Sequence, residues 1–204
     1  MDIKKKFIKT FGIIMAALLL TGCGNTDKGN KKQETAGSES SSITKRPETG
    51  LNIPKEDQDG QKMPLFTTKD LQGNTVTDSI FQEKDLTVVN IWGTFCGPCI
   101  EEMPELAEWS ESMPSNVQII GLVCDIEGED DQEHKDKAKE IMEKAGADFT
   151  NLIPKEGLDN LLSGVTGVPT TIFIDKNGNI TGKAVVGANV AAYKEFVEDY
   201  INAE

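Results

Sequence analysis

Histidine and basic side chains are scarce in this chain of 204 residues. The one histidine, His134, lies in the polar stretch EDDQEHKDK and is most simply a solvated residue. Lysine and arginine number 21 against 34 acidic residues, which gives a formal net charge of −13. A surface this acidic argues against nucleic acid and against anionic lipid as partners. The sequence also shows no internal repeat.

Long hydrophobic runs are missing as well. The apolar stretch from Phe11 to Leu20 is too short to span a bilayer, but after four nearby lysines it suits the core of a signal peptide. It ends in LLLTGC, which resembles a bacterial lipobox at four consecutive positions. The resemblance implies removal of residues 1–22 and a lipid-modified N-terminus at Cys23, which would hold the protein on a membrane stably. The alternative is an ordinary secretory signal with an incidental cysteine.

The composition changes again between residues 24 and 61. This stretch consists of glycine, serine, threonine, lysine and glutamate with almost nothing apolar. Such a segment cannot bury enough surface to offset its ordering entropy, so residues 23–61 are predicted to be a lipidated cysteine followed by a disordered tether. A flexible coil of this length has a mean span of roughly 30 Å. Residues 62–204 remain as one domain of ordinary size.

Strand and helix patterns alternate through this domain. Short runs rich in valine and isoleucine occur at Asp85–Trp92, Val117–Asp125 and Thr170–Asp175, as expected for strands buried on both faces. Apolar residues recur at helical spacing in two segments, and each segment is predicted to be a helix. The first set is Ile100, Met103, Leu106, Ala107 and Met113, and the second is Tyr193, Phe196, Val197, Tyr200 and Ile201. The acidic stretch 127–145 is predicted to be a loop that leads into an exposed helix.

Two turn signals complete the pattern. Asn177-Gly178 predicts a hairpin whose second strand runs from Ile180 to Val186, and residues 72–74 predict a small hairpin near the start of the domain. The predicted order is β-hairpin, β, α, β, α, short β, short α, β-hairpin, α. A parallel βαβ unit followed by an antiparallel hairpin gives an α/β fold with a mixed central sheet flanked by helices.

Two of the four cysteines, Cys96 and Cys99, fall where the Asp85–Trp92 strand ends and a helix begins. A zinc site would need two more ligands, and Cys124 and His134 do not form a second chelating pair. An inert disulfide that closes so short a loop would stabilise little. A thiol in the first turn of a helix has a lowered pKa, which suits an exposed, attacking Cys96 with a shielded Cys99 behind it. Reversible redox exchange therefore fits best.

The residues around this pair resemble a known family. WGTFCGPC after a strand, followed about seventy residues later by GVPTTIFID, resembles the thioredoxin superfamily, and NIWGTFCGPCIEEMPEL and IDKNGNI resemble its extracytoplasmic TlpA/ResA-like thiol–disulfide oxidoreductases. The resemblance covers residues 62–204. It implies a thioredoxin-like fold with an N-terminal β-hairpin and an inserted helix. It also implies a cis Pro169 packed against the two cysteines, and a Val168 backbone that pairs with the client chain.

The same resemblance draws attention to Glu102. This residue shares a helix face with Cys99, three positions earlier, whereas Glu101 is turned away and reads as a surface charge. Relatives of the ResA type carry an acid at this spacing that tunes the cysteine pair. Asn90 stands where thioredoxin usually has a buried aspartate, and because asparagine does not titrate, proton handling is expected to shift to Glu102 or to water.

Several neighbours complete the predicted site. Pro98 suits the first helical turn, and Gly97 offers no side chain to block a partner. Trp92 and Phe95 flank the pair and are counted among the candidate client contacts, although core packing is the favoured reading for Trp92. Pro104 predicts a kink in the helix. Cys124, at the end of a strand, is either a third redox thiol or, as we favour, a small buried hydrophobe.

The predicted function is that of a monomeric, lipid-anchored thiol–disulfide oxidoreductase with no cofactor beyond its own disulfide. The resemblance suggests reduction of exported clients, such as apocytochrome c or a surface methionine sulfoxide reductase, and re-reduction by a membrane transporter of the CcdA/DsbD type. The alternative within this class is a disulfide-forming oxidant. A thiol peroxidase fits less well because Val89 and Gly93 stand where it would need proline and threonine or serine, and a copper chaperone would need a partnering histidine.

Overall fold

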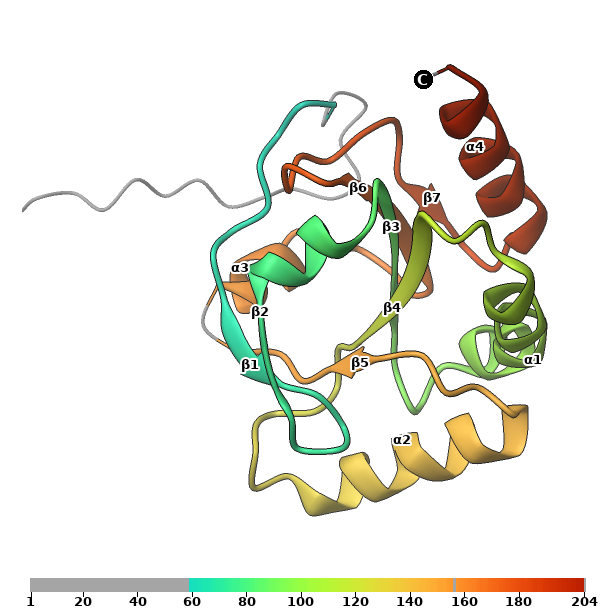
Figure 1. Cartoon of the computed structure of the whole chain (residues 1–204). Helices are drawn as coiled ribbons and strands as arrows, with labels where there is room; N and C mark the ends of the chain where they lie inside the picture. Colours follow the sequence, from blue (N-terminus) through green and yellow to red (C-terminus); the bar gives the residue numbers. More distant parts are fainter. Residues whose placement is uncertain (1–58, 156, 204) are drawn as a thin grey trace, which may run out of the picture. The chain divides into compact units, whose positions relative to one another are not determined.

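A five-stranded mixed sheet lies at the centre of the computed structural model, which describes residues 59–155 and 157–203 (Figure 1). The strand order is β5-β4-β3-β6-β7. The bounds are Leu86–Trp92 for β3, Val117–Val123 for β4, Asn151–Leu152 for β5, Thr170–Asp175 for β6 and Val185–Val186 for β7. β3 pairs in parallel with β4 and antiparallel with β6, and all seven of its residues are buried. The predicted mixed sheet is confirmed.

Helices cover both faces of this sheet. Their bounds are Gly97–Ser112 for α1, Gln132–Ala145 for α2, Leu158–Leu162 for α3 and Val190–Ala203 for α4, with a short 3-10 helix, η1, at Asp78–Glu83. Alternate residues of β3 belong to two separate cores, with Val88 and Trp92 in one and Val89 and Ile91 in the other. Buried side chains of α1, α2 and α4 belong to the first core, and those of η1 and α3 to the second.

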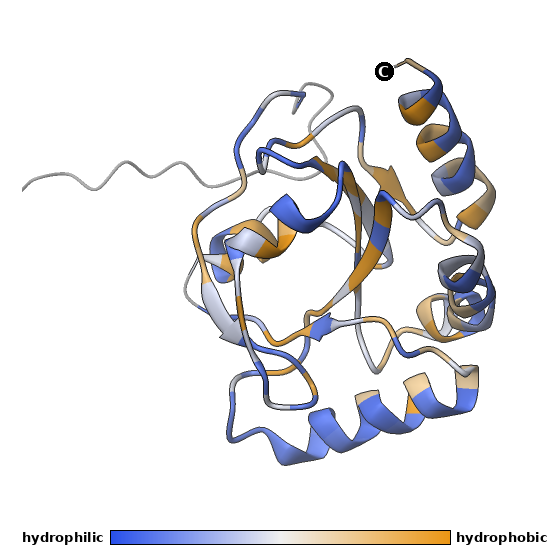
Figure 2. Cartoon of the chain, in the orientation of Figure 1, coloured by the Kyte–Doolittle hydropathy of each residue, from blue (hydrophilic) through white to orange (hydrophobic). Residues whose placement is uncertain are grey.

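The outer elements also follow the predicted order. β1 (Thr67–Lys69) and β2 (Thr75–Thr77) form the expected small antiparallel hairpin. α2 is polar over most of its surface (Figure 2), and only Ala138 and Met142 are buried. None of the helices in the described part of the chain is long and apolar enough to span a bilayer.

Local capping explains where α1 and α2 begin. Cys96 has extended backbone angles and caps α1, and Pro98 occupies the first turn, where its missing N–H is not needed. Asp131 caps α2 by accepting the backbone N–H of His134, and it also lies 2.8 Å from the imidazole Nδ1. His134 therefore contributes to a helix cap, while its side chain is 40% exposed, in agreement with its interpretation as a solvated residue. Hydrogen bonding to Asp131 raises the pKa of His134.

Two details differ from the sequence-based expectations. Ile100 is 38% exposed, while Trp109, which the pattern did not include, is buried. The predicted strand from Ile180 to Val186 is interrupted, since Ile180 forms an isolated bridge with Ile174 and only β7 pairs with the start of β6. Gly182, with a φ of 69°, lies between these two pairings and requires a backbone conformation that other residues rarely adopt. α1 continues through Pro104 as one helix, and the kink expected there stays a prediction.

Candidate active site

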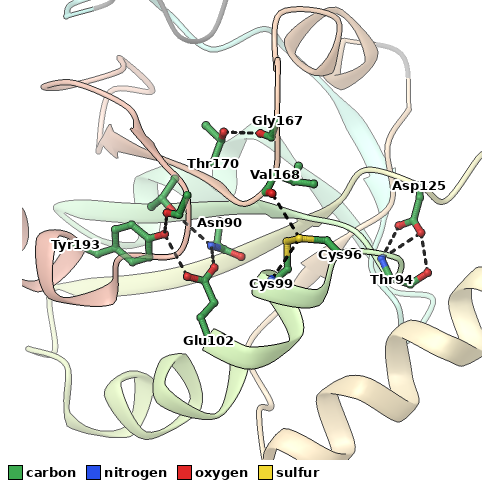
Figure 3. The surroundings of a disulfide bond; sticks show 12 residues. Asn90, Thr94, Cys96, Cys99, Glu102, Asp125, Gly167, Val168, Thr170 and Tyr193 are labelled. Atoms are coloured by element: carbon green, nitrogen blue, oxygen red, sulfur yellow. Dashed lines mark hydrogen bonds between the residues drawn. A yellow bond between two sulfur atoms is a disulfide. The ribbon is translucent and has the colours of Figure 1, made fainter.

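Cys96 and Cys99 form a disulfide at the junction of β3 and α1, with a sulfur–sulfur distance of 2.08 Å (Figure 3). The backbone N–H of Cys99 donates a hydrogen bond to Sγ of Cys96 at 3.2 Å. This N–H belongs to the first turn of α1, where unpaired N–H groups and the helix dipole favour negative charge. Cys96 is 6% exposed and Cys99 is fully buried, so Cys96 is the sulfur that a partner can approach.

A clamp on the preceding loop holds Cys96 in place. Asp125, just after β4, accepts the backbone N–H of Thr94 at 3.0 Å and its hydroxyl at 2.6 Å. The backbone N–H of Cys96 in turn donates to the carbonyl of Gly93 at 3.1 Å. Because β3 and β4 are parallel, their carboxyl ends meet at one edge of the sheet, and this edge carries both the clamp and the cysteine pair.

The segment before β6 lies against the disulfide. The peptide bond between Val168 and Pro169 is cis, as the family resemblance implied. The carbonyl oxygen of Val168 lies 3.4 Å from Sγ of Cys96 (Figure 3), and the backbone N–H of Gly187 donates to the carbonyl of Pro169 at 2.8 Å. The chain around Val168 is therefore fixed beside the reactive sulfur. Its pairing with a client backbone stays a prediction.

A buried polar cluster lies on the side of the pair away from Thr94 and Asp125 (Figure 3). Asn90 donates from its amide nitrogen to Glu102 Oε1 at 2.9 Å and to Thr171 Oγ1 at 3.1 Å. The hydroxyl of Tyr193 lies 3.2 Å from Glu102 Oε2 (Figure 3). These four side chains come from β3, α1, β6 and α4, and none is more than 6% exposed. Asn90 Oδ1 is the buried side-chain oxygen for which the described residues provide no hydrogen-bond partner.

The cluster holds an ionisable group close to the disulfide. Burial raises the pKa of Glu102, and Glu105 adds to that effect, while hydrogen bonds from Asn90 and Tyr193 oppose it. Glu101 is exposed, so the two neighbouring glutamates face in the directions expected from helical geometry. A carboxyl group with a raised pKa, one helical turn from Cys99, is suited to accept and release a proton.

A pocket of about 610 Å³ opens beside Cys96. It has no charged side chain among its lining residues, which are Phe95, Cys96, Cys124, Leu162, Val165, Thr166, Gly167 and Val168. Phe95 is 67% exposed at its rim, and Gly97 and Pro98 are exposed on the neighbouring turn. An added Cβ on Gly97 would meet nothing within 4 Å, so this turn presents an open face.

The surroundings of two predicted residues bear on the alternative interpretations of each. Trp92 is fully buried and donates from its indole nitrogen to Asn151 Oδ1 at 2.8 Å. It has no surface to offer a client, which corrects its inclusion among the client contacts and agrees with the core reading. Cys124 is half-buried beside the pocket, and burial, together with the charge of Asp125, raises the pKa of its thiol to about 11.

Sequence reasoning missed some of the residues around the pair. Tyr193 was assigned only to the apolar face of the last helix, and Thr94, Asp125 and Thr171 were not singled out. An aspartate and a threonine at the carboxyl ends of neighbouring parallel strands were a usable signal for the clamp. Cys23 lies outside the described residues. Among the described residues, no group of three or more histidine, cysteine or acidic side chains is arranged to hold a metal ion.

Comparison with known proteins agrees with this geometry. The Redoxin family model matches residues 58–197. The chain is 30% identical over 143 residues to the thiol-disulfide oxidoreductase ResA of Bacillus thuringiensis subsp. konkukian, covering 70% of this chain and 76% of that protein. It is 31% identical over 139 residues to the thiol:disulfide interchange protein DsbE of Vibrio cholerae, covering 67% of this chain and 70% of that protein.

A solved structure supports the fold. The thiol:disulfide interchange protein of the thioredoxin family from Chlorobium tepidum superimposes with a TM-score of 0.57 at 22% identity, covering 70% of this chain and 97% of that one. The order of the strands, the cysteine pair at the start of α1 and the family match agree with one another. The chain therefore belongs to the redoxin family, as a TlpA/ResA-like thiol–disulfide oxidoreductase with a thioredoxin-like fold.

Proposed function

We propose that this oxidoreductase reduces disulfides of exported client proteins while it is anchored to the outer face of the cell membrane. The observation that carries the chemistry is the asymmetry of the disulfide, since Cys96 borders an open pocket and Cys99 is fully buried. A partner can therefore form a mixed disulfide with Cys96, and the buried thiol behind it can release that partner.

The reaction balances with the two cysteines alone. In the reduced protein the Cys96 thiolate attacks a client disulfide, which forms a bond between Cys96 and the client and expels the first client thiolate. Cys99 then loses its proton and attacks Sγ of Cys96, so that the second client thiolate leaves and the Cys96–Cys99 bond forms. Two electrons pass to the client, and its two thiolates take protons from water or from the site.

Glu102 is proposed to receive the proton of Cys99. It follows Cys99 by one helical turn, and burial raises its pKa toward that of a thiol, which makes transfer of the proton from Cys99 less unfavourable. Asn90 donates one hydrogen bond to this carboxyl group without titrating itself. Glu102 is therefore the group proposed to handle the proton, because Asn90, its neighbour on β3, stays neutral.

Client binding is proposed to use the surface around Cys96. Phe95, Gly97 and Pro98 form one side of this surface, and the backbone of Val168, fixed next to Pro169, forms the other. The pocket between them is uncharged in a chain with a net charge of −13. A client segment with an apolar side chain near its cysteine would fit this pocket, because burying apolar surface there costs no charge desolvation.

The cellular setting is inferred from the sequence and from the relatives. The lipobox-like segment supports anchoring through Cys23, with residues 24–61 as a tether. Relatives named for thiol–disulfide oxidoreduction support protein thiols as clients. The proposed clients take part in cytochrome c maturation or include a surface methionine sulfoxide reductase. The proposed electron donor is a membrane protein of the CcdA/DsbD type, and the oxidoreductase is proposed to act as a monomer.

Two measurements on the purified full chain test this function. The protein should catalyse the reduction of insulin by dithiothreitol, and variants with serine at Cys96 or Cys99 should not. The reduction potential of the pair should lie closer to about −270 mV than to about −120 mV. No catalysis of insulin reduction would contradict the proposed function, and a potential near the upper value would make the protein a disulfide-forming oxidant.

A further inference from the structure

Glu102 is held by two side chains of different kinds. Asn90 approaches Oε1 from β3 and donates whichever protonation state Glu102 has. Tyr193 approaches Oε2 from α4, and its hydroxyl carries a single proton that can point in more than one direction. The two contacts therefore respond differently when the carboxyl group gains or loses a proton.

Two acceptors compete for the Tyr193 proton. Glu102 Oε2 lies 3.2 Å from the hydroxyl oxygen, and the carbonyl oxygen of Gly187 lies 2.9 Å from it. The backbone N–H of Asn189 donates to the same hydroxyl at 3.3 Å, and Thr171 also hydrogen-bonds to it. The hydroxyl thus has two acceptors for one proton, in a place with almost no access to water.

Both protonation states of Glu102 can be satisfied by these atoms. An ionised Glu102 accepts the Tyr193 proton in a charge-assisted hydrogen bond. A protonated Glu102 can instead donate to the hydroxyl oxygen, while Tyr193 turns its own proton to the Gly187 carbonyl. Because the Tyr193 oxygen has two lone pairs, the Thr171 hydroxyl then turns away and Glu102 takes its place as donor. Only hydrogens move, so the packing around the disulfide is the same in both states. Burial raises the pKa of Tyr193, so the hydroxyl keeps its proton throughout.

We propose that Tyr193 is a positioning residue for Glu102, and that its hydroxyl turns between Glu102 and the Gly187 carbonyl as Glu102 loses and gains its proton. This rests on the proposed function, in which Glu102 takes the proton of Cys99. Tyr193 would keep that carboxyl group in one position through the whole cycle.

Among the groups around Glu102, Tyr193 is the one whose hydrogen bond to the carboxyl group can adjust to its protonation state. β3 and β6 present the neutral side chains of Asn90 and Thr171 to the cluster. On α1 the ionisable neighbours are Cys99, one turn before Glu102, and Glu105, which pairs with Lys194 of α4 at 2.9 Å near the surface. Glu105 favours the protonated form of Glu102, whereas a proton donated by Tyr193 favours the ionised form.

The test follows the carboxyl titration of Glu102 in the oxidised full chain, where neither Cys96 nor Cys99 titrates. Carbon-13 NMR of labelled glutamate identifies the Glu102 signal by its loss in the Glu102→Gln variant. Tyr193→Phe removes one hydroxyl and keeps the ring, so the titration midpoint should rise by about one pH unit. A midpoint equal to that of the unmodified chain would overturn the proposal.

Two further samples make the result specific. Tyr200→Phe is the same change two turns further along α4, about 10 Å away, and should leave the midpoint unchanged. Replacing both tyrosines by fluorotyrosine keeps the side chain and makes the hydroxyl a stronger donor, so the midpoint should fall. A rise with fluorotyrosine would overturn the proposal even if Tyr193→Phe folds poorly. Since this titration needs no turnover, a failure of insulin reduction would count against the proposed function alone.

Discussion

At the scale of single residues, the site depends on which polar side chains are buried together. Asn90 and Glu102 were both singled out from the sequence, because their distances from the cysteines fix the strand position and the helix face. Tyr193 was not predictable as their partner, since it lies 91 positions after Glu102 and its helical spacing matches an ordinary core residue. Spacing within one element is readable from sequence, whereas contact between α1 and α4 depends on packing.

Replacing Glu102 by glutamine should make stability less dependent on pH. The pKa of Glu102 is raised in the folded protein, mainly by burial. The wild-type chain therefore loses stability as the pH rises from the pKa of an unfolded glutamate through the folded value. The Glu102→Gln variant lacks this loss, so its free energy of unfolding relative to wild type should increase over that pH range. Urea denaturation of both oxidised proteins at several pH values would measure it, and a constant difference would contradict the assigned burial.

Cys124 should react slowly despite its position at the pocket. Its thiol has a pKa of about 11, so little thiolate exists at pH 8. In an oxidised chain with Cys23→Ser, Cys124 is the one thiol left, and its alkylation by iodoacetamide should be about a hundredfold slower than that of an unperturbed cysteine. Rapid alkylation in the folded protein would instead favour a role as a third redox thiol.

At the scale of the elements, nearly all the strands and helices were predictable. β3, β4 and β6 have apolar runs that match strands buried on both faces, and β6 matches its prediction residue for residue. The interrupted strand before β7 was not predictable, because the turn signal at Asn177-Gly178 says nothing about pairing beyond Gly182. η1 was also not predicted, because a 3-10 helix this short leaves no recognisable hydrophobic periodicity in the sequence.

The junction of β3, β4 and β5 should be sensitive to a single added methyl group. A Cβ on Gly121 would overlap the side chain of Asn151, which accepts the indole N–H of Trp92. Gly121→Ala should therefore lower the free energy of unfolding by about 2–3 kcal/mol, through overpacking and a weakened buried hydrogen bond. Gly97→Ala, where the added carbon meets open space, should change it by less than about 1 kcal/mol. Equal effects of the two substitutions in urea denaturation would contradict this packing.

At the scale of the whole molecule, composition separates three parts of the chain. The domain, its fold and its chemistry were readable from residues 62–204 because two motifs in the right order specify them. The proposed role of residues 1–61 depends on the lipobox-like segment and on composition alone. Client identity was not readable, because the pocket beside Cys96 specifies apolar character and a lack of charge, but no sequence.

Membrane anchoring through Cys23 predicts covalent lipid labelling. The full chain, produced in a bacterium fed with labelled palmitate, should carry the label and sediment with the membrane fraction. Cys23→Ser should remove the label, because the sulfur that takes the diacylglycerol is gone. Label that persists in Cys23→Ser would contradict the lipobox interpretation.

The proposed roles of Cys96 as the attacking thiol and Cys99 as the resolving thiol are tested most directly by trapping. In the Cys99→Ser variant of the full chain, expressed in its native organism, clients should accumulate as mixed disulfides. Mass spectrometry should find these bonds at Cys96, and dithiothreitol should release the clients. The matched Cys96→Ser variant should accumulate none, because Cys99 is buried. Adducts formed through Cys99 in Cys96→Ser, or none in Cys99→Ser, would contradict the account.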